Sequence, residues 1–431
     1  MRTSLQGIAK RAGEQKKHRF QDLYRMLNEE FLKDCWRDIR KDAASGVDEV
    51  SAEQYEENLE ENVRELVERL KRKRYRARLV KRAYIPKGDG RKRPLGIPVI
   101  EDKLLQMGVK RILEAIYEQD FLPCSYGYRP GVGALDAVKD LTERLQFGRY
   151  SFIVEADIKS YFDNVDHDWM TRMLEERIDD SPFVRLIGKW LKAGVLETEG
   201  KVTHPMTGTP QGGVVSPILA NIYLHYALDL WFEKVVKKHC RGKAYLVRYA
   251  DDYVCAFEYQ GDAERFYRAM VKRLKRFGLE LSAEKTRIMT FDRKPPRGRE
   301  RFEFLGFEFY WGMDRGGRPR VKRRTSRKNL RRSIKRFTAW CKENLHLRTR
   351  ELFRRLNTKL RGYYRYYGVI GNYASLKQFF EQVVRILHKW LNRRSQRRSY
   401  NWPAYKAILK HYAIAEPRIN RQSKTRQLLL V

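Results

Sequence analysis

The stretch "AYLVRYADDYVCAF", residues 244–257, places two adjacent acidic residues between two apolar runs of strand-forming residues. Asp251 and Asp252 stand where a tight turn would join the two strands of a hairpin. Two neighbouring carboxylates repel each other and titrate abnormally unless a positive charge lies between them. The stretch therefore predicts a hairpin whose tip holds a cation.

A third acidic residue ends another predicted strand. "SFIVEADIKSYFDNVDH" (151–167) begins as an apolar strand and stops at Asp157. A carboxylate at the end of a buried strand is costly unless it is paired or bound to a metal. Taken alone, such a residue is more often a helix cap or one half of an ion pair.

A glycine-rich segment lies between these two acidic stretches. "GTPQGGVVSPILANIYLHYALD" (208–229) contains three glycines and two prolines, and then a helix begins. Gly212 and Gly213 would allow the backbone to approach a flat ligand closely.

The order of these elements predicts an α/β (α+β) fold built on a βαββαβ sheet, with helices packed on one face. In such a sheet Asp157 can lie beside the Asp251–Asp252 turn. Three carboxylates at one point need a strong counter-charge, and Mg²⁺ with oxygen ligands is the natural choice because it also binds phosphates. Two such ions serve phosphoryl transfer.

Other segments predict the surroundings of this sheet. Ser51 and Gln54 form a capping box that opens a helix ending near residue 70. "AYIPKGDGRKRPLGIPVI" (83–100) predicts a hairpin with a cationic turn, which is either a solvated loop or a phosphate clamp. Residues 168–195 predict a helix, and a later helix ends at Gly278. "GLELSAEKTRIM" (278–289) predicts a strand, and "RFEFLGFEFYWG" (301–312) predicts a short hairpin.

The charge of the chain is uneven. It has 91 Lys and Arg residues against 54 Asp and Glu residues, a net charge of +37, and 33 basic against 5 acidic residues fall within 311–431. Such an excess favours a polyanionic partner. Three basic helices are predicted here, at 326–344, 349–368 and 374–394. Within "LRGYYRYYGVIGNY" (360–373), about half of the following tyrosines are expected to pack in a core, while aromatic faces can also stack on bases: Tyr363, Tyr364, Tyr366 and Tyr367.

The five cysteines form no C-x-x-C pair, which argues against a zinc ribbon or a disulfide framework. No apolar signal region and no 18-residue apolar run occur, so the sequence predicts an intracellular protein without a membrane partner.

In their order along the chain, these blocks resemble the reverse transcriptases. "RYADDYV" resembles the family's Y-x-D-D box, and six other segments resemble its successive blocks between about residues 80 and 310: "IPKGDGRKRPLGIP", "SYGYRPG", "EADIKSYFDNVDH", "GTPQGGVVSPILANIYL", "LELSAEKT" and "FEFLGFEF". The YADD form, the "GTPQGG" loop, the block before residue 80 and the basic tail resemble the reverse transcriptase/maturases encoded by bacterial group II introns.

The resemblance implies a role for each of these residues. Asp157, Asp251 and Asp252, with the backbone carbonyl of Ile158, would hold two Mg²⁺ ions, with Mn²⁺ as a substitute. Five further residues would contact the incoming dNTP, and Phe162 among them would exclude a ribose 2′-hydroxyl: Lys87, Arg93, Phe162, Gln211 and Lys285. Five residues of the basic tail would contact nucleic acid: Arg361, Tyr364, Arg365, Arg393 and Arg394.

The resemblance also implies a right-hand polymerase with the following modules: an N-terminal extension and fingers block (1–78), fingers and palm (79–312), a helical thumb or maturase X domain (313–398) and a basic nucleic-acid-binding segment (399–431). It implies a bacterial cytoplasmic location. The expected partners are an RNA template and a DNA primer, dNTPs, group II intron RNA and target DNA, for splicing and retrohoming. The HNH nuclease module with paired cysteines that often ends such proteins is not expected.

Three other readings stay open. The polymerase could be of the retron, CRISPR-associated or phage-defence type; the chain could be an RNA-binding splicing factor with little polymerase activity; or it could be an RNA-dependent RNA polymerase. The basic helical tail and the N-terminal block argue against the first, and a neighbouring intron ribozyme would decide it. Phe162 is the residue that discriminates the third. The second is opposed by the presence of the following residues: Asp157, Asp251, Asp252, Lys87 and Gln211.

Overall fold

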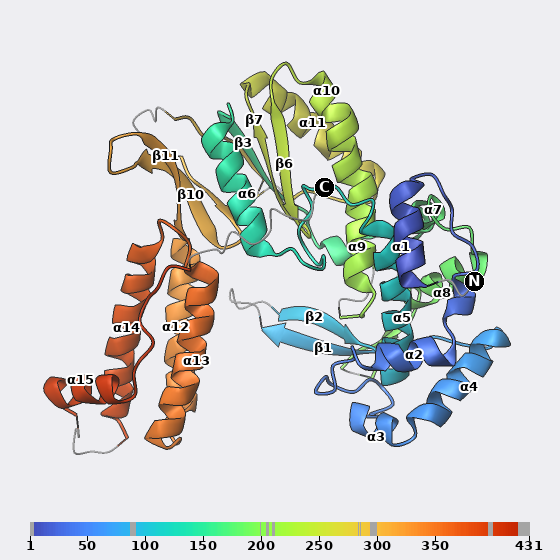
Figure 1. Ribbon diagram of the computed structural model, residues 1–431, viewed down its shortest axis with the longest axis horizontal. Helices are drawn as coiled ribbons and strands as arrows, with labels where there is room; N and C mark the ends of the chain where they lie inside the picture. The colour runs from blue at the N-terminus through green and yellow to red at the C-terminus, as the bar shows by residue number, and fades with distance from the viewer. Residues whose placement is uncertain are drawn as a thin grey trace. The chain divides into compact units, whose positions relative to one another are not determined.

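The computed structural model describes residues 4–86, 92–198, 200–203, 207–208, 212–282, 284, 286–293, 300–394 and 400–420. Contacts divide the chain into two compact units. The first contains Met1–Leu141 and Gly148–Thr290, and the second contains Thr142–Phe147 and Phe291–Val431. Figure 1 colours both along the chain. The predicted module boundaries at 78, 312 and 398 concern functional parts and stay predictions.

The first unit begins with short helices. The predicted capping box is confirmed: the Ser51 side chain accepts from the Gln54 N–H, and the Gln54 side chain accepts from the Ser51 N–H. The prediction of a single helix after it is wrong. The helix is interrupted at Asn58, and the Asn62 side-chain amide donates to the Tyr55 carbonyl, which in a continuous helix would accept from a backbone N–H. The elements are α1 (Leu5–Glu14), the 3₁₀ turn η1 (Tyr24–Met26), α2 (Glu29–Trp36), α3 (Ala52–Glu57) and α4 (Leu59–Lys71).

A β-hairpin follows, as predicted for residues 83–100. Strands β1 (Val80–Pro86) and β2 (Lys92–Ile97) pair antiparallel, and the tip between them lies outside the described residues. Two short strands, β4 (Val195–Leu196) and β5 (Val202–Thr203), extend this sheet in the order β2-β1-β4-β5. Helix α5 (Ile100–Tyr117) then runs through the unit, buried along most of its length, and α6 (Ala134–Phe147) follows it.

The central sheet has the order β6-β7-β3-β8. Its strands are β3 (Phe152–Asp157), β6 (Ala244–Tyr249), β7 (Asp252–Phe257) and β8 (Arg287–Thr290), and every neighbouring pair is antiparallel. Strand β3 leads through helices to the β6–β7 hairpin, and α11 (Gln260–Arg276) leads on to β8. This is the predicted βαββαβ arrangement, and β3 ends at Asp157 as predicted. Figure 1 shows β3, β6 and β7 side by side.

The expectation that helices cover one face of this sheet is wrong. Tyr253 and Cys255 of β7 belong to the main core with α11, yet Val254 between them is also buried and points to the other face. On that face the Tyr245 hydroxyl of β6 donates to Asp140 of α6. Side chains and helices therefore pack on both faces of this sheet.

The connection from β3 to β6 is helical. The predicted helix over 168–195 is two helices, since Pro182 has no N–H to continue a helix and the Asp180 side chain caps the second one at the Phe183 N–H. The elements are the 3₁₀ turn η2 (Tyr161–Asp163), α7 (His167–Glu175), α8 (Ser181–Leu191), α9 (Ser216–Leu224), the π-helical segments η3 (His225–Asp229) and η4 (Phe232–Val236), and α10 (Lys237–His239). Gly278, with φ 69°, follows α11 as the predicted terminating glycine.

The second unit joins a small sheet to a helical bundle. Strands β9 (Phe302–Phe304) and β10 (Phe307–Met313) form the predicted hairpin, and β11 (Pro319–Thr325), which the sequence reading did not predict, pairs with β10. The three predicted helices are present as α12 (Arg327–Glu343), α13 (Thr349–Tyr367) and α14 (Tyr373–Leu391), and α15 (Trp402–His411) is an addition. Their apolar stripes share one core.

Among the described helices, none combines the length and the apolar character that crossing a membrane would require.

Candidate active site

Three carboxylates from distant parts of the chain occupy neighbouring backbone positions. Asp157, the last residue of β3, is the register partner of Asp252, the first residue of β7, and Asp251 lies in the two-residue turn just before it. Directly opposed residues of an antiparallel pair project to the same face, with Cβ atoms about 4.5–5.5 Å apart. All three residues are half-buried. The end of β3 therefore lies beside the turn between β6 and β7, as the sequence predicts.

The turn that carries Asp251 has an unusual backbone. Ala250 has φ 56°, in the left-handed region that residues with a Cβ rarely adopt. Two-residue hairpin turns need such a conformation, usually supplied by Gly or Asn. A strained residue persists when its surroundings hold it in place. Gly127 is part of those surroundings: a Cβ added to it would lie 2.3 Å from the Ala250 nitrogen.

Arg248 braces the same turn from inside the protein. Its Nη1 donates to the Ala250 carbonyl at 3.0 Å and to Asn221 Oδ1 at 3.0 Å. Its Nε and Nη2 donate to the two oxygens of Asp229 at 2.8 and 2.6 Å, and Nη2 also donates to Ser125 Oγ at 2.7 Å. These bonds use all five N–H groups of the guanidinium. The Arg248 side chain therefore connects the hairpin to the 125–131 loop, to α9 and to η3.

The Arg248 side chain has no solvent exposure, and neither has Asp229. Burial acts to lower the pKa of Arg248, but the Asp229 carboxylate more than offsets this and holds the pKa above its ordinary value. Sequence reasoning did not select Arg248. The available signal was a basic residue inside the apolar strand "AYLVRY", since an unpaired charge there would be very costly.

The backbone carbonyl of Ile158 is positioned by an isolated bridge to Leu281. The two hydrogen bonds of this bridge run from Ser282 N to the Asp157 carbonyl and from Lys159 N to the Glu280 carbonyl, both at 2.8 Å. They leave the Ile158 carbonyl out of the pairing, immediately beside Asp157.

These groups offer only hard oxygen atoms, which fits Mg²⁺ better than the softer transition metals. Within the described part of the chain, no three His, Cys, Asp or Glu side chains are gathered closely enough to form a metal site by themselves. The oxygen atoms of the three carboxylates and of the Ile158 carbonyl nevertheless fit the ligand chemistry of a divalent metal ion.

Two other predicted residues can be placed relative to the turn. Burial raises the pKa of Tyr128, the Asp251 carboxylate raises it further, and Arg93 lowers it, so both charges lie within electrostatic range of this hydroxyl. Phe162 lies in η2, five residues after Asp157, and is half-buried. Three residues expected to bind dNTP lie outside the described residues: Lys87, Gln211 and Lys285.

The glycine-rich segment is anchored on both sides of residues 209–211. On one side Gly208, with φ 96°, donates its N–H to the Val165 carbonyl at 2.7 Å and packs on the Phe162 backbone. On the other side a Cβ added to Gly212 would lie 2.4 Å from the Gly96 carbonyl of β2. A side chain at residue 212 would therefore collide with the backbone of β2, and the approach to a flat ligand expected for Gly212 and Gly213 stays a prediction.

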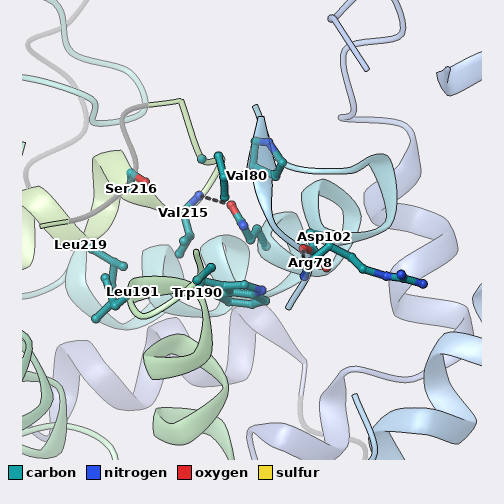
Figure 2. Close-up of a pocket in the computed structure, with 12 residues that line it drawn as sticks. Arg78, Val80, Asp102, Trp190, Leu191, Val215, Ser216 and Leu219 are labelled. Carbon is teal, nitrogen blue, oxygen red and sulfur yellow. Dashed lines mark hydrogen bonds between the residues drawn. The ribbon is translucent and has the colours of Figure 1, made fainter. Parts of the chain in front are cut away.

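Gln106 of α5 fixes the end of this segment. Its Oε1 accepts from the N–H of Val214 at 2.9 Å and from that of Val215 at 3.5 Å. Figure 2 marks the hydrogen bond at the Val215 N–H with a dashed line, in a small pocket that Asp102 and Trp190 also line. Sequence reasoning missed Gln106, because a polar residue on a helix gives no sign that it faces a loop more than 100 positions away.

The residues predicted to bind nucleic acid divide into two groups. Arg361, Arg365 and Arg393 are exposed. Tyr364 is only 1% exposed and belongs to the core of the second unit, so its prediction as a nucleic-acid contact is wrong. Arg394 is half-buried and donates to the Leu347 carbonyl at 3.1 Å, which gives it a structural contact.

The tyrosines around Tyr364 also pack more than expected. Tyr363 stacks on Phe379 with ring centroids 3.9 Å apart, and the Tyr366 hydroxyl donates to the Leu305 carbonyl at 2.8 Å. Tyr367 contacts Phe307. All four side chains are buried or half-buried, so the "YYRYY" run mainly joins α13 to α14 and to the small sheet.

Comparison with curated proteins points to intron-encoded proteins. The group II intron-encoded protein LtrA of Lactococcus lactis subsp. cremoris is 47% identical over 147 residues, which are 34% of this chain and 24% of LtrA. Protein YkfC of Escherichia coli K12 is 32% identical over 276 residues, which are 56% of this chain and 69% of YkfC. Nuclear intron maturase 4, mitochondrial, of Arabidopsis thaliana is 28% identical over 154 residues, 35% of this chain and 18% of that protein.

The chain thus spans about a quarter of the length of LtrA. The profile of one family, described as "Reverse transcriptase (RNA-dependent DNA polymerase)", matches residues 85–309, which is more than half of the chain and includes all three carboxylates. These matches support the resemblance to group II intron reverse transcriptase/maturases, and the chain belongs to the reverse transcriptase family.

Proposed function

We propose that the chain is an RNA-directed DNA polymerase that adds dNTPs to the 3′-hydroxyl of a DNA primer on an RNA template. The observation that carries this proposal is the register pairing of Asp157 with Asp252, with Asp251 in the adjoining turn. Grouped carboxylates at strand ends suit the binding of metal ions together with the phosphates of a substrate.

Asp157, Asp251, Asp252 and the Ile158 carbonyl would hold two Mg²⁺ ions, for which Mn²⁺ could substitute, because all four groups offer oxygen ligands. When bound, such ions lower the pKa of a primer hydroxyl and neutralise charge on the reacting phosphate. The bracing by Arg248 and Gly127 keeps the Asp251 turn in a fixed position, so little reorganisation is needed when substrate arrives.

The incoming dNTP would be held by residues around this turn. Arg93, which shares the surroundings of Tyr128 with Asp251, would neutralise triphosphate charge together with Lys87 and Lys285. Gln211 would pack against the nucleotide, and the Phe162 ring would exclude a 2′-hydroxyl, since it offers no hydrogen bond and occupies the space.

Assistance of intron splicing is the second proposed activity. It is favoured by the printed names of the similar proteins, a group II intron-encoded protein and an intron maturase. The exposed Arg361, Arg365 and Arg393 on basic helices would contact intron RNA or target DNA. A protein that binds the folded ribozyme more tightly than the unfolded one stabilises it by linkage alone.

Primer extension tests the main proposal. The protein, a DNA primer annealed to an RNA template, and Mg²⁺ are incubated with dNTPs or with rNTPs, and Asp251→Asn is tested in parallel. We expect extension with dNTPs only and its loss in Asp251→Asn, while filter binding of the template stays within about twofold. Extension by Asp251→Asn at the unmodified rate would contradict the assignment of the site.

A further inference from the structure

A wide groove lies in the first unit, between the segment of residues 73–79 and helices α7 and α8. Its volume is about 1290 Å³, larger than the roughly 300–1,000 Å³ of most small-molecule sites. Among the described residues that line it, none is one of the three carboxylates of the candidate active site. It also lies in the other unit from the basic helices α12–α14.

Basic residues outnumber acidic residues in the lining of the groove. Two exposed acidic residues, Asp168 and Glu175, also line it. The six basic residues come from both walls and are all exposed: Lys73, Arg74 and Arg76 from the segment, and Arg185, Lys189 and Lys192 from α8 and its end. Cations on facing walls raise each other's energy unless an anion lies between them.

The groove cations differ in their ion pairing from the basic residues at the end of α4 and just after it. There Lys71 pairs with Glu68 at 2.9 Å, Arg72 is 3.7 Å from the same carboxylate, and Arg69 pairs with Glu101. In the groove, no carboxylate among the described residues forms an ion pair with Arg74, Arg76 or Arg185. Within the described part of the chain, acidic partners are thus found for the basic residues just before the groove but not for these three side chains.

One wall of the groove is held in place by a buried network. Tyr75, between two of the cations, is only 1% exposed; its hydroxyl donates to Asp102 at 2.6 Å and accepts from Trp190 Nε1 at 2.7 Å. Asp102 also accepts the Arg78 N–H at 3.0 Å, and Lys189 Nζ donates to the Tyr75 carbonyl at 2.6 Å. A segment without helix or strand is thus fixed to α5 and α8, which makes the cation positions preorganised.

We propose that this groove binds the phosphodiester backbone of a nucleic-acid strand, as a contact separate from the candidate active site. The inference rests on the proposed function, because it assumes that the chain works on nucleic acid. Basic side chains on two walls suit a strand that carries one charge per nucleotide, and a volume of about 1290 Å³ is too large for a single phosphate. RNA and DNA share this chemistry, and the experiment separates them.

The test compares two triple variants with equal loss of charge. Arg74→Gln/Arg76→Gln/Arg185→Gln removes groove cations. The control, Arg268→Gln/Lys272→Gln/Lys275→Gln, removes three exposed cations of α11 that lie outside the groove. Binding of a fluorescent single-stranded RNA and of a DNA of the same sequence is measured between 50 and 400 mM salt, and thermal melting checks that both variants fold.

We expect the groove variant to lose about tenfold or more in affinity at about 100 mM salt, and the slope of log K against log salt to flatten by about two relative to the control. A loss for RNA alone identifies an RNA groove, and a loss for DNA alone identifies a DNA groove. If the groove variant binds both RNA and DNA as tightly as the control variant does, the inference is overturned. This is the result expected if the groove instead binds an acidic protein. Binding does not depend on chemistry, so failure of the proposed polymerase activity would appear separately, in the Asp251→Asn comparison.

Discussion

The guanidinium of Arg248 and the carboxylate of Asp229 form a two-bond ion pair with no solvent exposure, and the same guanidinium holds the Ala250 carbonyl beside Asp251. The geometry of the candidate active-site turn therefore depends on a charge pair inside the protein. A buried pair of this kind contributes little net stability compared with apolar residues, but breaking it leaves an uncompensated charge.

Arg248→Lys should both destabilise the protein and misplace the turn. A lysine cannot reproduce the planar fork, so Asp229 and Asn221 lose partners, at a cost of about 3–5 kcal/mol of unfolding free energy. In urea unfolding we expect a loss of this size. At a temperature where the variant stays folded, kcat for extension should fall by a larger factor than the factor by which KM for dNTP rises. The reason is that Arg248 positions the turn without touching substrate.

The matched control is Arg64→Lys, because Arg64 is half-exposed and pairs with the equally exposed Glu61 at the surface of α4. Surface pairs contribute about 1 kcal/mol or less, so this variant should extend primers normally. If Arg248→Lys behaved like the control in both measurements, the positioning role would be wrong.

Gly127→Ala should shift the Asp251 turn. The added methyl would lie 2.3 Å from the Ala250 nitrogen, and the contacted atom is backbone, which cannot rotate away. We expect a loss of about 1–3 kcal/mol in stability and a fall of at least tenfold in kcat/KM for dNTP. Gly261→Ala is the control, because nothing lies within 4 Å of its added Cβ. Equal activity of the two variants would show that the contact does not set the turn.

Phe162→Ala should admit ribonucleotides. Removing the ring opens space for a 2′-hydroxyl, so the preference for dNTPs over rNTPs should fall by about tenfold or more, measured as the ratio of kcat/KM values in single-nucleotide incorporation. Phe147→Ala is the control, because Phe147 is 82% exposed and is no part of the site. An unchanged ratio in Phe162→Ala would remove Phe162 from the proposed gate.

Asp102 should give the unfolding free energy a pH dependence. Burial, the largest cause, raises the pKa of its carboxyl to about 6, although the Tyr75 hydrogen bond acts to lower it. The folded state then binds the proton more tightly than the unfolded state, so the stabilisation is full below about pH 4 and is lost as the pH rises through about 6.

Urea unfolding at pH 4.5 and pH 7.5 checks this. Relative to Asp102→Asn, which does not titrate, the unmodified protein should lose on the order of 2–3 kcal/mol between the two pH values. Parallel pH profiles of the two proteins would show that Asp102 does not titrate in this range.

Local features of the fold followed from the sequence because each is decided within a few residues. The Ser51–Gln54 capping box, the end of β3 at Asp157 and the terminating Gly278 all appear where the pattern predicts them. The same reading joined α7 to α8 and α3 to α4, because an apolar stripe continues across a break that one proline or one asparagine side chain creates.

The sequence by itself determined which elements form and which residues end them, since propensity, capping and alternation act between near neighbours. Only the tertiary structure decided that Arg248 would meet Ser125, 123 positions away, that Tyr364 would enter a core, and that cations from residue 73 to residue 192 would face one groove. These contacts depend on how whole elements pack, and packing is settled by the summed burial of many side chains rather than by any local pattern.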